Sequence, residues 1–216
     1  NINYFEEALK SLSSQTDQRF KVYIGNDASP NNAEILIEKY KLDFNISYKK
    51  FEDNLGQTSL VKHWERCIAL TSNEEWMLVL GDDDVLSENY VAQFYEHLGK
   101  VKQHHFQVVR FATQVIDANG KVISKKYIHP SLEKASDAFY RRFKEETRSS
   151  LSEYIFSRKV YDESGFCHYP LGWHTDDMAW LQFTNKEPIF TINAALAFIR
   201  ISENSISGVS DNFKLK

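Results

Sequence analysis

The sequence has little cysteine and no long apolar run. Two cysteines, Cys67 and Cys167, occur in 216 residues. This excludes a disulfide-dense secreted scaffold and favours a reducing compartment. Every apolar run is far shorter than the roughly 20 residues that cross a bilayer, so no transmembrane helix is predicted. Because the net charge is −4, the basic surface typical of nucleic-acid-binding proteins is also missing.

Several chemical signatures are missing as well. The sequence shows no P-loop, dinucleotide-binding fingerprint, zinc motif or serine nucleophile elbow. It also lacks repeats, low-complexity tracts and linkers. Apolar residues make up 42% and charged residues 26% of the chain, which is ordinary for a globular protein. We therefore expect one domain over residues 1–216 with a full core.

Strand and helix patterns alternate along the first two-thirds of the chain. Short apolar or period-two runs predict strands, and apolar residues at helical spacing predict helices between them. The expected strands are 20–24, 44–51, 76–80, 106–116, 151–156, 189–192 and 195–201, with a helix near 175 capped by Thr175. This alternation predicts an α/β fold with a mixed, mostly parallel central sheet and helices on both faces.

Three consecutive carboxylates, Asp82, Asp83 and Asp84, directly follow the strand predicted at 76–80. In open α/β sheets, ligands bind beyond the carboxyl ends of the strands. Adjacent carboxylates repel one another near a low-dielectric core, and a divalent cation such as Mn²⁺ or Mg²⁺ removes that penalty. The alternative is an acidic turn that complements the dipole of the next helix.

A second polar group, Asn26 and Asp27, follows the strand predicted at 20–24. Such side chains can hydrogen-bond a nucleotide base or ribose at a topological switch point. The alternative is a purely structural Asx turn, since Asn, Asp, Ser and Pro all favour turns.

A third group, Asp176 and Asp177, lies at the start of a predicted helix, after Trp173 and His174. A carboxylate there can accept a proton from an attacking hydroxyl, and aromatic rings can stack on a sugar. We expect Trp173 and His174 on the acceptor side. The alternative is that the acids complement the helix dipole and the aromatic rings only fill the core.

In this order, the three groups resemble the inverting glycosyltransferases of the family-two type, which have the GT-A fold. The segment GNDAS (25–29) is similar to the family's Asp-Asp-Gly-Ser, with Asp27 in the position near the donor base. The segment WMLVLGDDDVL (76–86) is similar to Leu-Asp-x-Asp-Asp. In this alignment Gly81 occupies the position of the family's first Asp, so the resemblance implies that Asp83 is the main metal ligand and that Asp82 lies near the ribose. A second alignment, which matches Asp82 and Asp84 to the motif, stays open.

Two further segments extend the resemblance. The segment HTDDMAW (174–180) resembles the family's acceptor-side acidic pair, whose second acid, here Asp177, is the base. Near the end, Ser202 stands where many members have the histidine of Arg-x-His. The strand that normally precedes the family's first helix is expected before residue 1.

The resemblance implies a metal-dependent transfer of a sugar from a nucleotide-diphospho-sugar, with uridine diphosphate preferred, to a saccharide or lipid-linked saccharide. Asn26, Asp27, Asp82 and Asp83 are expected at the donor. It also implies polysaccharide assembly in the cytoplasm, at the inner face of the membrane, with peripheral membrane association left open. Two other classes fit the same residues: a sugar nucleotidyltransferase, and a binding module without catalysis.

Overall fold

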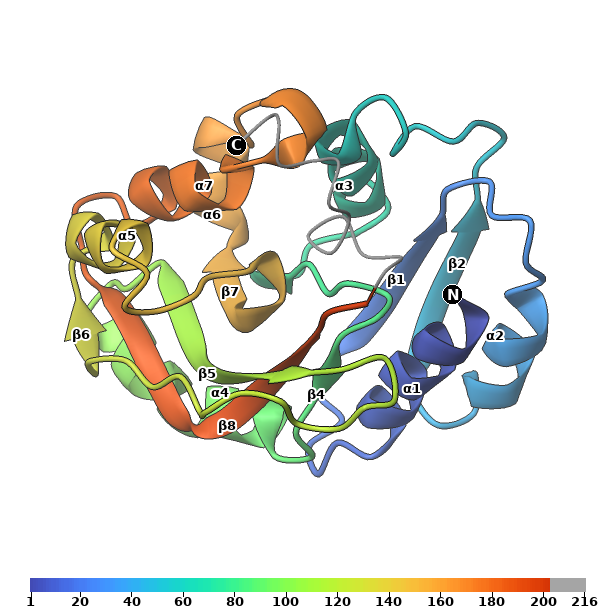
Figure 1. Ribbon diagram of the computed structural model, residues 1–216, viewed down its shortest axis with the longest axis horizontal. Helices are drawn as coiled ribbons and strands as arrows, with labels where there is room; N and C mark the ends of the chain where they lie inside the picture. The colour runs from blue at the N-terminus through green and yellow to red at the C-terminus, as the bar shows by residue number, and fades with distance from the viewer. Residues whose placement is uncertain (203–216) are drawn as a thin grey trace.

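A central mixed sheet with helices on both faces forms the protein in the computed structural model, which describes residues 1–202 apart from the side chain of Leu171 (Figure 1). The helices are α1 (Ile2–Ser13), α2 (Glu34–Tyr40), α3 (Leu60–Ile68), α4 (Tyr90–Gln103), α5 (Ala135–Phe143), α6 (Arg158–Ser164) and α7 (Thr175–Phe183), with short 3₁₀ turns η1 (Leu151–Glu153) and η2 (Pro170–Gly172). The α/β class predicted from the sequence is confirmed.

The strands are arranged in two hydrogen-bonded groups. They are β1 (Lys21–Asn26), β2 (Asn45–Lys50), β3 (Trp76–Leu78), β4 (Val85–Leu86), β5 (Val108–Ile116), β6 (Leu132–Glu133), β7 (Tyr154–Ser157) and β8 (Ile189–Arg200). β1 and β2 pair in parallel, and the second group runs β3-β7-β5-β8-β4, with β6 also on β8. The two longest pairings, β1–β2 and β5–β8, are parallel, and the shorter ones are antiparallel.

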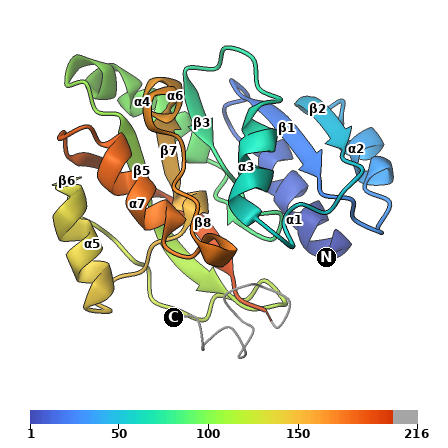
Figure 2. The ribbon, with the colours of Figure 1, turned by 90° about the horizontal axis from the view of Figure 1, so that it is seen from above.

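Two apolar clusters cover the two faces of the sheet, and Figure 2 shows the arrangement of the helices that contribute to them. One joins α1, α2 and α4 to β5 and β8, with Tyr90 of α4 stacked on Phe111 of β5 at 3.8 Å between ring centroids. The other joins α3, α5, α6 and α7 to β7, and Tyr154 stacks there on Trp180 at 4.0 Å. Within residues 1–202, no helix is long and apolar enough to cross a membrane.

Three details differ from the sequence-based expectation. The predicted strands 189–192 and 195–201 form one strand, β8, whose register against β5 shifts between Phe111 and Ala112. The residue before α7 is His174, not Thr175, because Thr175 is fully buried and its hydroxyl donates to the Cys167 carbonyl. A third difference concerns the continuous apolar run at 76–80, which is typical of a central strand; β3 lies instead at the end of its sheet path, among the strands described.

Candidate active site

The acidic turn, Gly81–Asp84, connects β3 to β4, where the apolar strand ends and the chain bends back toward β8. Asp83 and Asp84 point toward a common space: a Cβ on Gly81 would lie 3.1 Å from an oxygen of each. Asp84 is buried and Asp82 is exposed. The turn therefore brings two carboxylates together, with glycine leaving the space between them open.

These two carboxylates are held away from water, and the effect of burial outweighs the positive charges of Arg200 and Arg148 near them. Burial, and next the charge of Asp83, raise the pKa of Asp84 to about 7. Burial and the charge of Asp82 also raise the pKa of Asp83. A carboxyl group in this state gains from any cation that binds beside it.

Arg200, the last residue of β8, holds the acidic turn in place. Its backbone N–H donates to Asp84 Oδ1 at 2.9 Å, and its Nε donates to the Asp83 carbonyl at 2.9 Å. Its Nη1 donates to the carbonyl of Asp117, and Nη2 pairs with Glu7 of α1. Four segments are thus joined by one buried guanidinium group, and its contacts with the turn go mainly to the backbone.

The short η1 turn lies between the acidic turn and the charges of α7. Ser152 Oγ accepts the Gly81 N–H at 3.0 Å and also lies beside Asp84. The adjacent Glu153 is fully buried, and burial, with the charge of Asp176 as a smaller cause, raises its pKa to about 7. Arg148 and Ser150 donate to Glu153 Oε2, while Oε1 has no hydrogen-bond partner in the described structure. Ser152 therefore contacts the acidic turn, and Glu153 interacts electrostatically with Asp176.

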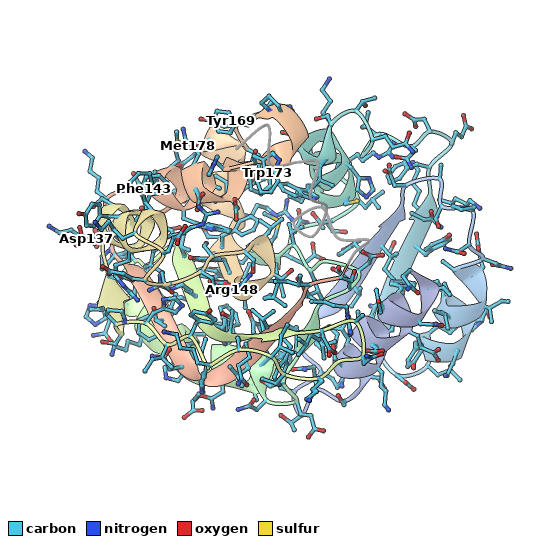
Figure 3. The ribbon with its side chains drawn as sticks, viewed as in Figure 1. Asp137, Phe143, Arg148, Tyr169, Trp173 and Met178 are labelled. Carbon is cyan, nitrogen blue, oxygen red and sulfur yellow. The ribbon has the colours of Figure 1, made fainter. Side chains whose placement is uncertain are left out.

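The second acidic group lies at the start of α7, on the side that faces α3 (Figures 1 and 3). The Asp177 side chain is buried, and its Oδ2 contacts His174 Nδ1 at 2.9 Å and Arg142 Nη1 at 3.1 Å. Burial, followed by the charge of Asp177, raises the pKa of half-buried Asp176 to about 6. Trp173, labelled in Figure 3, precedes His174 and is half-buried at the end of η2.

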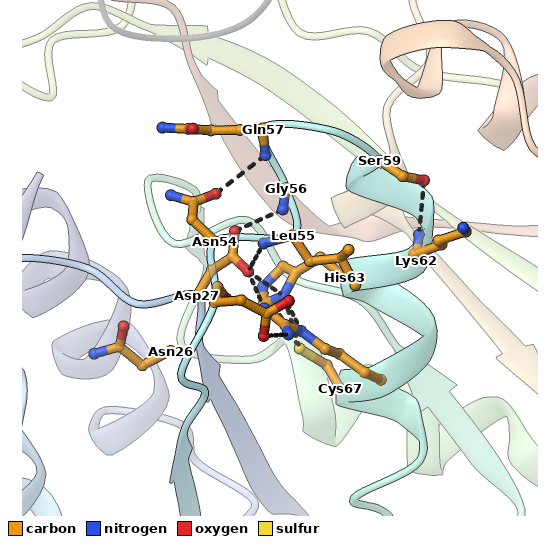
Figure 4. Close-up of polar contacts among 12 residues, drawn as sticks. Asn26, Asp27, Asn54, Leu55, Gly56, Gln57, Ser59, Lys62, His63 and Cys67 are labelled. Carbon is orange, nitrogen blue, oxygen red and sulfur yellow. Dashed lines mark hydrogen bonds and ion pairs between the residues drawn. The ribbon is translucent and has the colours of Figure 1, made fainter.

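Asp27, after β1, is already surrounded by donors (Figure 4). Its carboxylate accepts the N–H groups of Leu55 and Gly56 at 2.9 and 2.8 Å. It also pairs with Arg66 of α3 and contacts His63 Nδ1 at 3.2 Å. Arg66 in turn donates to the Asp53 carbonyl at 2.9 Å. Asp27 thus ties the loop 53–56 and α3 to the end of β1.

Asn26 is buried and also engaged. Its Nδ2 donates to the Tyr48 hydroxyl at 2.9 Å, and its Oδ1 accepts the Ser29 N–H at 2.8 Å. The latter is the Asx-type turn that was the structural alternative for this segment. Asn26 therefore shapes the turn after β1, where Ala28 has a positive φ of 55°.

No complete metal site exists among residues 1–202: no three His, Cys, Asp or Glu side chains are grouped so as to hold an ion. Asp83 and Asp84 still fit a cation, because they converge and their raised pKa values mark two carboxyl groups that resist ionisation without one. Mg²⁺ is commonly held by one or two carboxylates together with substrate phosphates.

Comparison with known families decides the class of protein. The model of the family described as glycosyl transferase family 2 matches residues 2–168. This chain belongs to that family. The match covers the acidic turn and the Asn26–Asp27 segment, and it favours the glycosyltransferase expectation over a sugar nucleotidyltransferase.

Solved structures show the fold of this family 2 domain in other proteins. S. aureus TarS in complex with UDP-GlcNAc has a TM-score of 0.73 at 16% identity, over 96% of this chain and 58% of that one. A mannosyltransferase from Pyrobaculum calidifontis, with GDP-Man and Mn²⁺, has a TM-score of 0.62 at 10% identity, over 95% of this chain and 55% of that one. GalNAc-T7 with UDP, GalNAc and Mn²⁺ has 0.57 at 13% identity, over 89% and 40%. The GT-A fold is thereby confirmed.

The chain spans less than two-thirds of each of these three structures. No curated protein sequence matches it.

Three residues of this family 2 domain were missed by the sequence reasoning. Arg66, Arg142 and Glu153 interact with the candidate residues from distant segments. They lie on charged helices or next to serines, where nothing in the pattern distinguishes them from surface residues. Arg200 stands at the arginine of the Arg-x-His segment, but its contacts with the acidic turn were not predicted.

Proposed function

We propose that this family 2 domain transfers a sugar from a nucleotide-diphospho-sugar, with uridine diphosphate as the nucleotide, to a saccharide or lipid-linked saccharide, with inversion at the anomeric carbon. The observation that carries the proposal is the acidic turn, whose converging carboxylates have raised pKa values. The nucleotide sugars bound in the similar structures support the donor class.

A divalent cation, Mn²⁺ or Mg²⁺, fits this proposal. Asp83 is the principal ligand we propose, with Asp84 beside it and exposed Asp82 toward the ribose or the ion's waters. When bound, the cation would act as a Lewis acid that stabilises the charge developing on the departing nucleoside diphosphate. The Mn²⁺ in the structures of GalNAc-T7 and the mannosyltransferase supports this choice.

Asn26 and Asp27 contribute to the donor side through their neighbours. Asp27 fixes the backbone of Leu55 and Gly56 and orients Arg66, so a base that binds at this edge would meet a preorganised loop. Preorganisation lowers the ordering cost of binding. Asn26 holds the turn at residue 29 in the same way.

The reaction we propose is a single displacement. The acceptor oxygen attacks the anomeric carbon from the face opposite the phosphate, the bond to the phosphate oxygen breaks, and configuration inverts. The acids of α7, with Asp177 as the base carboxylate, provide for the acceptor's proton. Trp173 and His174 contact the acceptor. The setting we propose is polysaccharide assembly in the cytoplasm, at the inner face of the membrane.

A thermal-shift screen of nucleotide sugars, with and without Mn²⁺, tests the proposal. We expect one donor to raise the Tm only when Mn²⁺ is present, because donor and cation bind together at the acidic turn. Asp83→Ala should abolish this rise in Tm, and calorimetry should show that it no longer binds the donor in the presence of Mn²⁺. Glu88→Gln, which removes an exposed charge near the same turn, should keep both. Unchanged donor affinity in Asp83→Ala would assign the cation to other residues.

Turnover separates an enzyme from a binding module. The enzyme should release free nucleoside diphosphate slowly even in the absence of acceptor, through transfer to water. Asp177→Asn should lower the rate of transfer by about 10²-fold or more, which is the magnitude of general-base catalysis. Its affinity for the donor should stay within a factor of about two. Donor binding without any release of nucleoside diphosphate would identify a binding module.

A further inference from the structure

The large apolar side chains that remain exposed lie mostly in one part of the chain. Among the described side chains of residues 1–202, eleven are exposed, and seven of these lie between residues 122 and 143. They are Val122, Ile123, Ile128, Leu132, Phe139, Tyr140 and Phe143. Exposed apolar residues scattered singly are normal, whereas a concentrated set indicates a contact surface. We call residues 121–144 the basic-apolar surface, for the lysines that accompany these side chains.

The first half of the basic-apolar surface is held against the sheet. Bridges join Tyr127 to Thr113 and Val122 to Ile116 of β5. The chain then passes through β6 directly into α5. In Figures 1 and 2 this part of the chain runs along the edge of the molecule from the end of β5 to α5. The exposed apolar side chains therefore belong to ordered backbone at the border of the fold.

The second half, α5, presents its large side chains outward. Ala135 and Ala138 are buried in the apolar cluster that α7 joins. Phe139 and Phe143, one turn apart, are 39% and 73% exposed, and Tyr140 beside them is 60% exposed (Figure 3). A helix that only covers a core keeps its large apolar residues inside. α5 therefore has a second apolar face, which no side chain described in residues 1–202 buries.

Five exposed lysines accompany these side chains: Lys121, Lys125, Lys126, Lys134 and Lys144. Residues 121–132 contain no acidic residue, although the chain has a net charge of −4. Within residues 1–202, the ion pairs of lysines form on α2 and α4 or next to them, away from this surface. Buried Glu133 pairs with two arginines. Exposed Asp137 and the acids at 145–146 lower the charge around α5, so the positive charge is highest over 121–134.

This combination of side chains matches the interface of an anionic bilayer. Apolar and aromatic side chains insert at the boundary of the acyl chains, while lysines contact anionic headgroups through their long stems. Interfaces between proteins, in contrast, are depleted in lysine relative to the rest of the surface. The chemistry of this surface therefore favours a lipid surface over a protein partner.

We propose that the basic-apolar surface binds membranes that contain anionic lipids, with α5 lying in the interface. α5 also borders the proposed acceptor side, because Arg142 Nη1 lies 3.1 Å from Asp177 Oδ2. A membrane bound at α5 would bring a lipid-linked saccharide to the start of α7. The binding itself does not depend on sugar transfer, but its use for a lipid-linked acceptor rests on the function proposed above.

Cosedimentation with vesicles tests the role of charge. The protein should bind vesicles of phosphatidylglycerol and phosphatidylcholine about tenfold or more tightly than vesicles of phosphatidylcholine alone. Raising NaCl from about 0.1 M to about 1 M shortens the screening length from about 10 Å to about 3 Å and should release most of the protein. The triple variant Lys121→Gln, Lys125→Gln, Lys134→Gln should bind about 10²-fold more weakly, because each lysine near an anionic surface contributes about fivefold. Lys126 is left unchanged, since it bonds the Asn193 carbonyl.

A matched control removes three exposed lysines from other elements: Lys10→Gln in α1, Lys100→Gln in α4 and Lys159→Gln in α6. It has the same net charge as the first triple variant, but it should keep the wild-type affinity for the anionic vesicles. Equal weakening of the two triple variants would overturn the proposal, because it would show that net charge alone drives binding.

The insertion of α5 is tested with a tryptophan probe. Phe143→Trp should add fluorescence, relative to the wild type, that lipids with brominated acyl chains quench. Leu42→Trp should add fluorescence that they do not quench, since Leu42 is 90% exposed but follows α2, at the opposite end of the molecule from α5 (Figure 1). Phe143→Ser should weaken binding to vesicles about tenfold, which is the effect of burying a phenylalanine side chain.

Three results would decide against this inference. Equal binding to both kinds of vesicle, or bound Phe143→Trp without quenching, would overturn it. A wild type that binds no vesicles but forms a dimer, which Phe143→Ser dissociates in sedimentation, would assign the surface to contact between two copies. Transfer to a soluble acceptor without vesicle binding would refute this inference and leave the proposed function intact. Vesicle binding without any sugar transfer would support it and refute the proposed function alone.

Discussion

Two carboxylate groups, each placed directly after a strand, differ sharply in their surroundings. Asp27 follows β1 and is matched by an arginine, a histidine and two backbone N–H groups. Asp83 and Asp84 follow β3, where burial and then the neighbouring carboxylates raise their pKa values, and Ser152, Arg148 and Arg200 offset only part of this rise. Placement after a strand is therefore not enough to identify a ligand site. The balance of donors against carboxylates distinguishes a structural aspartate from one that lacks a cation.

The largest expected effect tests this contrast directly. Asp27→Ala should lower the free energy of unfolding by about 2 kcal/mol, because Arg66 and two backbone N–H groups lose a partly buried partner. Asp83→Ala should change it by no more than about 0.5 kcal/mol in metal-free buffer, since it removes a carboxylate whose charged form is disfavoured by burial and by Asp82 despite the nearby Arg200. Guanidinium unfolding of both variants gives the comparison. Equal losses would show that the two carboxylates have the same structural role.

A smaller effect concerns pH and the buried Glu153. Between the ordinary glutamate pKa of about 4.3 and its folded value of about 7, the folded chain holds a proton that the unfolded chain has released. Stability therefore falls as pH rises through this window, and Glu153 contributes to the fall. In Glu153→Gln the loss of Tm from pH 5 to pH 8 should shrink by about 2–4 °C, or roughly 1 kcal/mol for a chain of this size.

The control for this measurement is Glu88→Gln, which alters an exposed carboxyl group. Its Tm should follow the wild type at both pH values. Some dependence on pH should remain in Glu153→Gln, because the pKa of Asp84 is raised over the same range. A Glu153→Gln profile parallel to that of the wild type would show that Glu153 is ionised without penalty.

The smallest change in stability is expected at Gly81. A methyl group there would lie 3.1 Å from oxygens of both Asp83 and Asp84, so Gly81→Ala should push the carboxylates apart. We expect the Tm to change by less than about 2 °C, well under 1 kcal/mol, while calorimetry shows Mn²⁺-dependent donor affinity about tenfold lower, or 1.4 kcal/mol. Gly99→Ala in α4, where nothing lies within 4 Å, should leave that affinity unchanged. A Gly81→Ala protein with normal affinity would exclude the space beside Gly81 as the cation position.

The sequence predicted the fold class and most of its elements, because local periodicity determines them. The run at 20–24 became β1, and the helical spacing from Leu60 became α3. The prediction from the sequence was wrong at β8, where Asn193 interrupts the apolar pattern and suggested two strands instead of one. The shifted register against β5 absorbs that interruption, and the Asn193 side chain bonds the backbone of His129 instead. A bulge of this kind depends on the partner strand, so one strand's pattern does not reveal it.

The candidate site was predicted only in its acidic members. Asp82–Asp84 and Asp176–Asp177 are adjacent in sequence, so a short pattern exposes them. Their partners are far away: Arg142 reaches Asp177 from another helix, and Arg200 reaches Asp84 across 116 positions. Such pairs arise from tertiary packing. The pairing of an aspartate with a distant arginine could therefore be seen only in the folded structure, not in the sequence.

The position of Arg200 has a consequence for how the protein acquires its activity during synthesis. The acidic turn ends at Asp84, but it is fixed by the backbone N–H and the guanidinium of Arg200. The ribosome adds Arg200 more than a hundred residues after the turn. Contacts of such long sequence separation form late, because a large loop must close first. A chain still on the ribosome thus has its carboxylates but not their arrangement, and the donor site proposed above is complete only after β8 has joined the sheet.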